Sequence, residues 1–388
     1  MREYTKLCDV CDFQGGSQPP KDEWSFDLKA GYIRMLQIRD FTQSERVVPE
    51  YIKITKTTKT CEADDILIAR YGASLGKILT GLAGAYNVAI MKAIPDTNML
   101  EKKYLYYYLK SPIFQGFLLN VGSRAAQAGF NKNDLQDLLI PNITRNEQVE
   151  IVGILERVET VIEVRQKELQ KLDNLLKARF VEMFGDPVRN SMRLPTEPMT
   201  TVCAIIDGDR GKNYPKQDEF SDTGYCLFLN AKSVTATGFS FENRMFITKE
   251  KDNALHNGKL ERGDVVLTTR GTLGNLALYD DSVPFENVRI NSGMVILRMN
   301  KSVMTEVFFM EQFKLQLQSI KGKIASGSAQ PQLPISTMNK IRILLAPMAL
   351  QEQFADFVQQ VDKSKLAVQK SLEKTQLLFD SLMQEYFG

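Results

Sequence analysis

The chain consists of two copies of one sequence unit, and this repeat constrains its fold more than any other feature. Residues 7–21 (LCDVCDFQGGSQPPK) align without a gap on residues 202–216 (VCAIIDGDRGKNYPK), which pairs Cys8 with Cys203 at a separation of 195 residues. Three further matches follow in the same order: 64–76 with 263–274, 122–123 with 327–328, and 147–148 with 352–353. Chance similarity of short motifs is the alternative, but the shared order favours two copies of one fold.

Each copy changes character once along its length. Its first part, ~145 residues, mixes turns, short helices such as 101–109 and apolar segments bounded by turn residues, which predict buried strands. These predicted strands include 65–69, 265–269 and 292–297. The second part of each copy is helical throughout, at 147–185 and 351–388. We therefore expect a mixed α/β (α+β) fold.

The two helical parts carry apolar residues at every seventh position, as coiled-coil helices do. The residues expected to pack a pair of helices together are Leu155, Ile162, Leu169, Leu176, Val361, Val368, Leu372 and Phe379. A stripe of this length is too long for one small globule to cover, so the two helices most simply pack against each other. Two independent surface helices are the alternative.

These patterns predict four segments with a pseudo-twofold internal repeat. Two similar globules would be separated by an antiparallel, coiled-coil-like pair of long helices. The expected boundaries are globule one at 1–146, helix one at 147–185, globule two at 186–350 and helix two at 351–388.

Composition excludes most kinds of catalytic chemistry. The 388 residues contain a single histidine, His256, which removes almost every His-based triad and His-rich metal site. The glycine-rich segment 72–77 (GASLGK) has three residues between its glycines, and Ile78 follows the lysine, so it does not fit a phosphate-binding loop. Cys8 and Cys11 have the spacing of half a zinc site, but no second pair lies nearby, so buried thiols are the simpler interpretation. We expect no catalytic residue, no metal site and no cofactor in this chain.

The chain carries neither a targeting segment nor a membrane span that we can recognise. Its N-terminus, MREYTKLCDV, is charged from the second residue, and no apolar run approaches the ~18 residues of a span. Five sparse cysteines are typical of reduced thiols inside a cell. We expect a soluble, cytoplasmic protein with no membrane partner.

Polar and basic residues gather in the expected loops of both copies. Forty-nine Lys and Arg against 47 Asp and Glu give a net charge of only +2, so any basic surface must be local. Arg, Asn and Gln can read base edges, whereas Lys, Ser and Thr more often contact phosphates. The candidate DNA-binding residues are Arg70, Tyr71, Ser74, Lys77, Ser123, Arg124, Gln127, Asn131 and Lys132 in the first copy, and Arg210, Lys212, Asn213, Lys216, Arg270, Thr272, Asn275, Arg289, Asn291, Ser328, Gln330 and Gln332 in the second. For each residue taken singly, an ordinary solvated loop position is the alternative.

The order of motifs resembles the DNA specificity subunit of Type I restriction-modification enzymes over essentially the whole chain. In the second copy the motifs are LTTRGTLG, GSAQPQLP and IRILLAPMALQEQ before a long heptad helix. In the first copy they are ARYGASLGK, GSRAAQAGF and LLIPNITRNEQ. In one respect the copies differ: Arg70 lies two residues before Gly72, whereas Arg270 directly precedes Gly271.

This resemblance implies a non-catalytic subunit whose two target-recognition domains each read half of a bipartite sequence in double-stranded DNA. It also implies that the helices set the gap between the half-sites and dock two modification methyltransferase subunits. Those partners would bind S-adenosylmethionine and methylate adenine, and restriction/translocase subunits would add ATP- and Mg-dependent translocation and cleavage.

A tandem repeat leaves two other functions to consider. One is a protein-interaction scaffold with no DNA specificity, which the near-neutral net charge slightly favours. The other is a self-sufficient modification-restriction enzyme, which the missing catalytic motifs contradict.

Overall fold

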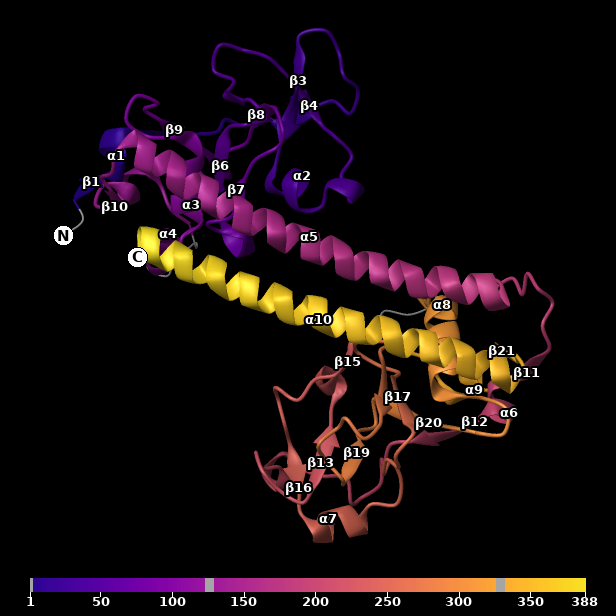
Figure 1. Ribbon diagram of the computed structural model, residues 1–388. Coiled ribbons are helices and arrows are strands. Elements are labelled where there is room, and N and C mark those ends of the chain that lie inside the picture. The colour runs from indigo at the N-terminus through magenta and orange to yellow at the C-terminus, as the bar shows by residue number, and fades with distance from the viewer. Residues whose placement is uncertain (1–2, 123–128, 326–331) are drawn as a thin grey trace. The chain divides into compact units, whose positions relative to one another are not determined.

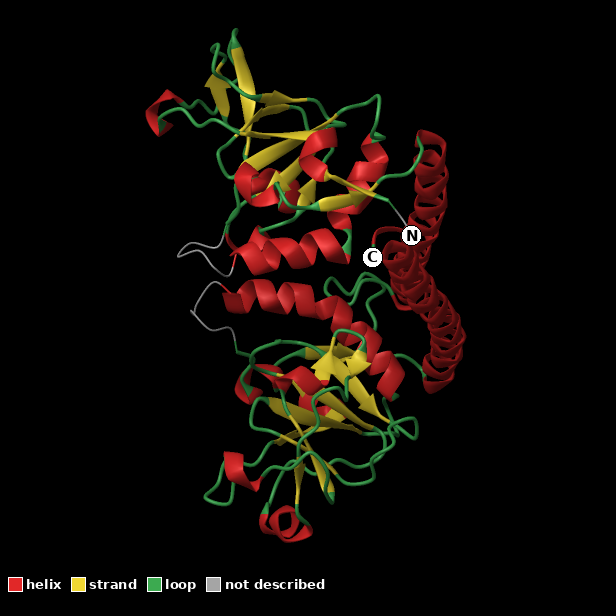
Figure 2. Ribbon diagram, turned by 90° about the vertical axis from the view of Figure 1, so that its left-hand side faces the viewer, coloured by secondary structure: helices red, strands yellow, loops and turns green. Residues whose placement is uncertain are grey.

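The computed structural model describes residues 3–122, 129–325 and 332–388. They form two compact units, which we call unit 1 (Met1–Gln166 with Lys370–Gly388) and unit 2 (Lys167–Gln369). Each unit combines strands with helices, as the yellow strands and red helices of Figure 2 show, so the predicted mixed α/β fold is confirmed. The division between the units runs through both long helices, α5 (Arg145–Phe184) and α10 (Met348–Phe387), which are labelled in Figure 1.

Unit 1 is built around two four-stranded sheets, ordered β2-β9-β6-β7 and β4-β3-β8-β5, and a short pair, β1-β10. Its strands are β1 Tyr4–Lys6, β2 Cys11–Gly15, β3 Tyr32–Leu36, β4 Tyr51–Lys53, β5 Thr60–Cys61, β6 Ile66–Ala69, β7 Ile78–Leu79, β8 Gly84–Tyr86, β9 Ile90–Pro95 and β10 Leu139–Pro141. Its helices besides the long ones are α1 Leu7–Val10, α2 Ile38–Thr42, α3 Lys102–Lys110 and α4 Pro112–Gly122, with short 3-10 turns at Lys21–Glu23, Ser44–Arg46, Gly72–Ser74 and Lys132–Leu135.

Unit 2 repeats this plan with a four-stranded sheet β12-β20-β17-β18, a three-stranded sheet β16-β13-β19, and the pairs β14-β15 and β11-β21. Its strands are β11 Thr196–Pro198, β12 Cys203–Asp207, β13 Cys226–Leu229, β14 Val234–Thr235, β15 Gly238–Phe239, β16 Phe246–Ile247, β17 Asp264–Thr268, β18 Leu276–Tyr279, β19 Val288–Ile290, β20 Met294–Met299 and β21 Arg342–Leu344. Its helices are α6 Met199–Val202, α7 Lys249–Ala254, α8 Glu306–Ala325 and α9 Ile335–Met338, with 3-10 turns at Gln217–Glu219 and Ala231–Ser233.

The structure confirms the repeat but corrects its alignment. β2 begins at Cys11 and β12 at Cys203, and each follows a four-residue helix, so Cys11 is the counterpart of Cys203, 192 residues apart. The predicted pairing of Cys8 with Cys203 is therefore wrong by three residues. The predicted alignment maximised the number of identical residues, whereas the true register is set by strand pairing, with Cys11 opposite Pro95 and Cys203 opposite Met299.

Both long helices begin slightly earlier than the heptad pattern predicted. α5 begins at Arg145 rather than 147, because Thr144 and Glu147 form a capping pair: the Thr144 N–H donates to Glu147 Oε2 (2.7 Å) and the Glu147 N–H to Thr144 Oγ1 (3.4 Å). α10 begins at Met348, directly after Pro347, rather than at 351. Among the described residues, no helix has the length and apolarity that crossing a bilayer requires.

In unit 1 the first half of α5 packs beside the last half of α10. Leu155 of α5 and Phe387 of α10 lie in one buried core. Rings of α3 extend this contact, since Tyr104 lies 5.1 Å from Phe387 and Tyr107 lies 6.3 Å from Phe379, between ring centroids. The early residues of one helix thus meet the late residues of the other, which is an antiparallel arrangement.

In unit 2 the last half of α5 packs beside the first half of α10. Phe354 of α10 contacts Phe180 and Phe184 of α5, with ring centroids 5.4 and 5.6 Å apart, and Phe308 of α8 stacks on Phe180 at 5.5 Å. Lys365 also pairs with Asp173 at 2.7 Å. The same antiparallel sense results, which excludes two independent surface helices.

The eight predicted packing residues divide evenly by burial. Leu155, Ile162, Leu176 and Val361 are buried, whereas Leu169, Val368, Leu372 and Phe379 are half-buried. The three phenylalanines Phe180, Phe184 and Phe354 are almost inaccessible. The largest apolar contacts of the helices therefore lie near their ends, where each helix also meets a globule.

A buried glutamine anchors the first turn of each long helix. In unit 2, Gln351 accepts the Thr305 N–H (2.9 Å) and donates to the carbonyls of Val303 (2.9 Å) and Ala346 (2.8 Å). In unit 1, Gln148 makes the equivalent bonds to the Glu101 N–H and to the carbonyls of Met99 and Ile143. The counterparts are thus 203 residues apart, and the predicted match of 147–148 with 352–353 is wrong by two residues.

Replacing Gln351 by alanine should destabilise unit 2 by about 3 kcal/mol, because one buried N–H and two buried carbonyls would lose their partner. Urea denaturation of the full chain would measure the loss. Gln359→Ala is the matched control, since Gln359 is exposed on the same helix and its replacement should change the free energy of unfolding by less than about 0.5 kcal/mol. Equal effects of the two substitutions would contradict the anchoring role.

Candidate nucleic-acid interface

In unit 2, several loops gather at one edge of the main sheet because of the strand directions. β12 and β17 both run antiparallel to β20, so both end where β20 begins, with Asp207 opposite Val295 and Thr268 opposite Met294. β13 runs parallel to β19, which ends just before β20. The loops that follow these strands are 208–213, 230–233, 269–275 and 291–293, and we call them together the unit 2 loop edge.

Hydrogen bonds join these loops into one surface. The N–H groups of Thr269 and Arg270 both donate to the Gly293 carbonyl, at 2.8 and 3.2 Å. Thr272 Oγ1 donates to the Ala231 carbonyl (3.1 Å), and Arg210 Nη2 donates to the Ser292 carbonyl (3.3 Å). Backbone groups, together with the side chains of Thr272 and Arg210, therefore hold the edge in a defined shape.

The predicted residues at the unit 2 loop edge differ in accessibility. Arg210, Lys212, Arg270 and Thr272 are exposed there, as is Lys216 just beyond the edge. Three amides are half-buried and bonded within the protein: Asn213 to the Ala254 carbonyl, Asn275 to the Val234 carbonyl and Asn291 Oδ1 to the Gly293 N–H.

Residues 332 and 333 also reach this edge. Gln332 is exposed, and its neighbour Leu333 donates its N–H to the Thr269 carbonyl (3.1 Å). Gln332 therefore lies beside the turn that carries Arg270. Ser328 and Gln330 lie outside the described residues.

The prediction that Arg289 contacts DNA is corrected by its burial. Only 4% of Arg289 is exposed, and its guanidinium donates to the Asp252 carboxylate and to the backbone carbonyls of Asp252, Leu255 and Asn257. A buried arginine with these partners has no face left for a ligand. Its sequence neighbourhood resembles that of a loop residue, but it lies on strand β19 and points inward.

Unit 1 forms the same edge from the equivalent strands. β2 and β6 both run antiparallel to β9, with Gly15 opposite Met91 and Ala69 opposite Ile90. The loops that follow are 16–18, 37, 70–77 and 87–89, the unit 1 loop edge. Its turn is shaped like that of unit 2, because Gly72 and Gly271 have φ of +69° and +70°, a conformation that favours glycine.

The two turns present their arginines differently. Arg70 is half-buried: Nε donates to the Phe130 carbonyl (3.1 Å), Nη1 donates to the Val88 carbonyl (3.2 Å), and the guanidinium lies 5.0 Å from the Tyr71 ring centroid. The exposed group at this turn is Tyr71 itself, at the position that Arg270 occupies in unit 2.

The remaining predicted residues of the first copy surround this turn only in part. Lys77 and Asn131 are exposed and Ser74 is half-buried. Lys132 pairs with Asp12, and this hydrogen bond holds the pKa of the Asp12 carboxyl below its ordinary value. Ser123, Arg124 and Gln127 lie outside the described residues.

Sequence reasoning missed a close backbone crossing that both edges share. A Cβ on Gly16 would lie 2.1 Å from the Asn87 carbonyl oxygen, and a Cβ on Gly208 would lie 2.2 Å from that of Asn291. The side-chain Oδ1 of each asparagine accepts the backbone N–H of the residue two positions later: Asn87 from Ala89 (3.2 Å) and Asn291 from Gly293 (2.9 Å). The separation of 192 residues between the glycines would have revealed the pair, had the repeat been aligned on its strands.

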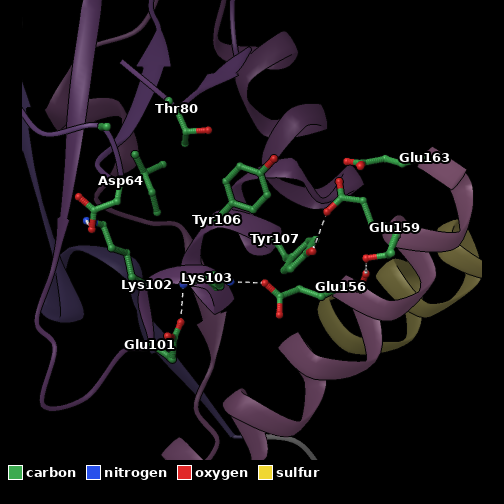
Figure 3. A pocket seen from close by; sticks show the side chains of 14 residues that line it. Asp64, Thr80, Glu101, Lys102, Lys103, Tyr106, Tyr107, Glu156, Glu159 and Glu163 are labelled. Atoms are coloured by element: carbon green, nitrogen blue, oxygen red, sulfur yellow. Dashed lines mark hydrogen bonds and ion pairs between the residues drawn. The ribbon is translucent and has the colours of Figure 1, made fainter. Parts of the chain in front are cut away.

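A pocket of about 800 Å³ lies in unit 1 between α3, α5 and the loops beside β6 and β7. Figure 3 shows that its charged side chains point toward one another: Lys103 pairs with Glu156, and the Tyr107 hydroxyl donates to Glu159 at 2.7 Å. Lys102 pairs with Asp64 at 2.8 Å. These pairs join α3 to α5 and to the loop before β6. The charged side chains that line the pocket therefore hold unit 1 together.

Nothing in the described part of the chain groups three or more His, Cys, Asp or Glu side chains as a metal site would. Burial raises the pKa of the Cys11 and Cys203 thiols to about 12 each, so both are protonated at neutral pH. Cys8 is half-buried, with its pKa raised chiefly by desolvation. Cys11 belongs to the hydrophobic core of unit 1 and Cys203 to that of unit 2.

Comparisons with known proteins show that one family model matches both halves of the chain. The model of the Type I restriction modification DNA specificity domain matches the chain twice, at residues 2–174 and 200–377. The specificity subunit of the Type I restriction enzyme MjaVIII from Methanocaldococcus jannaschii is 23% identical over 356 residues, covering 84% of this chain and 81% of that protein. The MjaIX specificity subunit of the same organism is 22% identical over 421 residues, covering 98% and 91%.

Two solved structures share the fold. One comes from work on complex assembly and conformational transition of a type I restriction-modification system, with a TM-score of 0.59, 17% identity and coverage of 99% of this chain and 97% of that one. The other is the S subunit of a Type I restriction-modification system from M. genitalium, with a TM-score of 0.53, 18% identity and coverage of 100% and 96%.

Proposed function

Because the chain belongs to the Type I restriction modification DNA specificity family, we propose that it is a non-catalytic subunit that recognises a bipartite sequence in double-stranded DNA. Each unit reads one half of the target with its loop edge. The methylating and cleaving chemistry belongs to other subunits.

The observation that carries this proposal is the same loop edge occurring twice, at equivalent strand ends. Both edges rest on a glycine crossing an asparagine backbone, and each exposes basic groups beside a glycine turn: Lys77 in unit 1, and Arg210, Lys212 and Arg270 in unit 2. Their exposed residues differ, Tyr71 in one and Arg270 in the other. The two loop edges thus share a backbone arrangement but carry different exposed side chains. This suits a protein that reads two different half-sites, because side-chain donors and acceptors distinguish the base edges.

The partners follow from the same proposal. Two modification methyltransferase subunits, which use S-adenosylmethionine, dock on the regions of α5 and α10, and these helices set the gap between the half-sites. Restriction/translocase subunits add ATP- and Mg²⁺-dependent steps. Because such a complex would act on cellular DNA, we propose that it is cytoplasmic.

The proposal predicts a specific pattern of DNA methylation. Cells that make this chain with its methyltransferase partner should carry adenine methylation in a bipartite motif, and deleting only this chain should abolish it. Exchanging residues 1–146 for the corresponding segment of a relative should change one half of the motif and leave the other half intact. Long-read sequencing that detects methylated bases measures both results.

The control is an exchange of residues 186–350, which should change the other half alone. An active methyltransferase whose methylation pattern is the same with and without this chain would contradict the proposed function. Loss of all methylation in both exchanged proteins would show misfolding of the hybrids, so their expression and cooperative unfolding are measured first.

A further inference from the structure

Two loops of unit 2 lie against each other with an unusually close approach of their backbones. A Cβ on Gly258 would lie 3.2 Å from the Gly208 Cα. The Asn213 amide donates from Nδ2 to the Ala254 carbonyl (2.9 Å), which ties the far ends of the loops together. We call the two loops, residues 208–213 and 255–258, the unit 2 platform.

A buried carboxylate holds the backbone N–H groups of the platform. Asp209 is 6% exposed, and its Oδ1 accepts the Gly211 N–H (2.8 Å) while its Oδ2 accepts the His256 N–H (2.7 Å). Burial opposes the charge on Asp209, but hydrogen bonds from these two groups and from the Asn257 N–H outweigh it and hold its pKa below the ordinary value. One side chain thus fixes both loops.

A buried guanidinium holds the carbonyl groups of the same loop. Arg289 Nη1 donates to the Asn257 carbonyl (2.7 Å), and Nη2 donates to the carbonyls of Asp252 (2.8 Å) and Leu255 (3.1 Å). Asp252 neutralises Arg289 and also pairs with Lys259 at 2.6 Å. Residues 255–257 are therefore held from one side by Asp209 and from the other by Arg289.

What the platform leaves accessible is a set of polar side chains. Arg210, Lys212, His256 and Asn257 are all exposed. The loop 208–213 belongs both to the platform and to the unit 2 loop edge, and Arg210 donates from it to the Ser292 carbonyl of the same edge. Lys and Arg suit phosphates, and His and Asn can bond to base edges or phosphates.

We propose that the unit 2 platform extends the DNA-contacting surface of the unit 2 loop edge to residues 255–258, so that His256 and Asn257 contact DNA beside Arg210 and Lys212, with Asp209 and Arg289 as positioning residues. This inference rests on the proposed function and assigns residues to it. Buried charges that pre-order the loops lower the entropy lost on binding, so they strengthen discrimination without touching DNA.

The corresponding position of unit 1 carries no charge. Ser17, 192 residues before Asp209, accepts the Lys59 N–H through its hydroxyl at 3.3 Å, whereas the Asp209 carboxylate accepts the N–H groups of Gly211 and His256. Damage to the platform should therefore affect one half of the target and spare the other.

The experiment uses the assembled methyltransferase complex and a library of bipartite DNA targets with single-base changes. Asp209→Asn places an NH₂ group opposite one backbone N–H, and Arg289→Gln removes the guanidinium that donates to three backbone carbonyls and to the Asp252 carboxylate. Each should lower discrimination at the half-site of unit 2 by about tenfold or more, with the half-site of unit 1 unchanged. The double variant His256→Ala with Asn257→Ala should act in the same direction without loss of stability, since both side chains are exposed.

Arg298→Gln is the matched control. It breaks the pair of Arg298 with the buried Asp264, at the opposite end of β17 from the loop edge, so it should lower stability without altering either half-site. Unchanged discrimination in the folded His256/Asn257 double variant and in a folded Asp209→Asn protein would overturn the inference. A wild-type complex that reads no bipartite motif would instead overturn the proposed function.

Discussion

Replacing Phe354 by alanine is expected to destabilise unit 2 by about 3–5 kcal/mol, because the lost ring leaves a cavity that its neighbours cannot fill. Phe354 is fully buried and lies between Phe180 and Phe184, with ring centroids 5.4 and 5.6 Å away. The substitution therefore removes the contact that joins the first half of α10 to the last half of α5. Urea denaturation of the full chain, followed by circular dichroism, would measure it.

Leu366→Ala is the control for Phe354→Ala. Leu366 lies on the same helix but is 56% exposed, so its replacement should change the free energy of unfolding by less than about 1 kcal/mol. A similarly small loss for Phe354→Ala would mean that the helices do not depend on each other for stability.

Adding a methyl group to either crossing glycine should damage one half-site. In Gly208→Ala the new Cβ would lie 2.2 Å from the Asn291 carbonyl oxygen, and in Gly16→Ala 2.1 Å from that of Asn87. Backbone must move to relieve either clash, at a cost of about 1–3 kcal/mol, and the loops of that edge move with it. We expect recognition of the corresponding half-site to weaken at least tenfold, measured by methylation of targets altered in each half.

The two variants control each other, because each should spare the half-site that the other damages. Gly153→Ala makes the same chemical change on α5, where no atom lies within 4 Å, and should stabilise the helix by about 0.5–1 kcal/mol. If Gly16→Ala and Gly208→Ala proteins methylated all altered targets like the wild type, the glycine crossings would have no part in recognition.

The repeat and the long helices could be predicted from the sequence, since both depend on patterns that lie along the chain. Heptad spacing located α5 and α10 within three residues of their starts. The strands predicted at 65–69 and 265–269 were found at Ile66–Ala69 and Asp264–Thr268. Apolar runs and turn glycines are local signals, so a strand can be predicted from them without knowing which strand it pairs with.

The exposed residues of the unit 2 loop edge and platform could be predicted only in part. Arg270 and Lys212 are exposed at the unit 2 loop edge, but Arg289, similar in its sequence setting, is buried against Asp252. His256 and Asn257, which sequence reasoning set aside or left unmentioned, are exposed on the platform. A charged side chain in a polar segment looks the same from the sequence, whether it faces solvent or an acidic partner 37 residues away.

By itself, the sequence determined that the chain is a tandem repeat of mixed α/β units with long amphipathic helices, because composition, order and periodicity are properties of neighbouring residues. Only the tertiary structure decided the register of the repeat, with Cys11 and not Cys8 opposite Cys203 in the alignment, because β-strand pairing joins residues more than 80 positions apart. It also decided which polar residues hold the loops and which remain exposed. Burial and hydrogen-bond partners are set by contacts distant in sequence, and those contacts distinguish a buried arginine such as Arg289 from an exposed one such as Arg270.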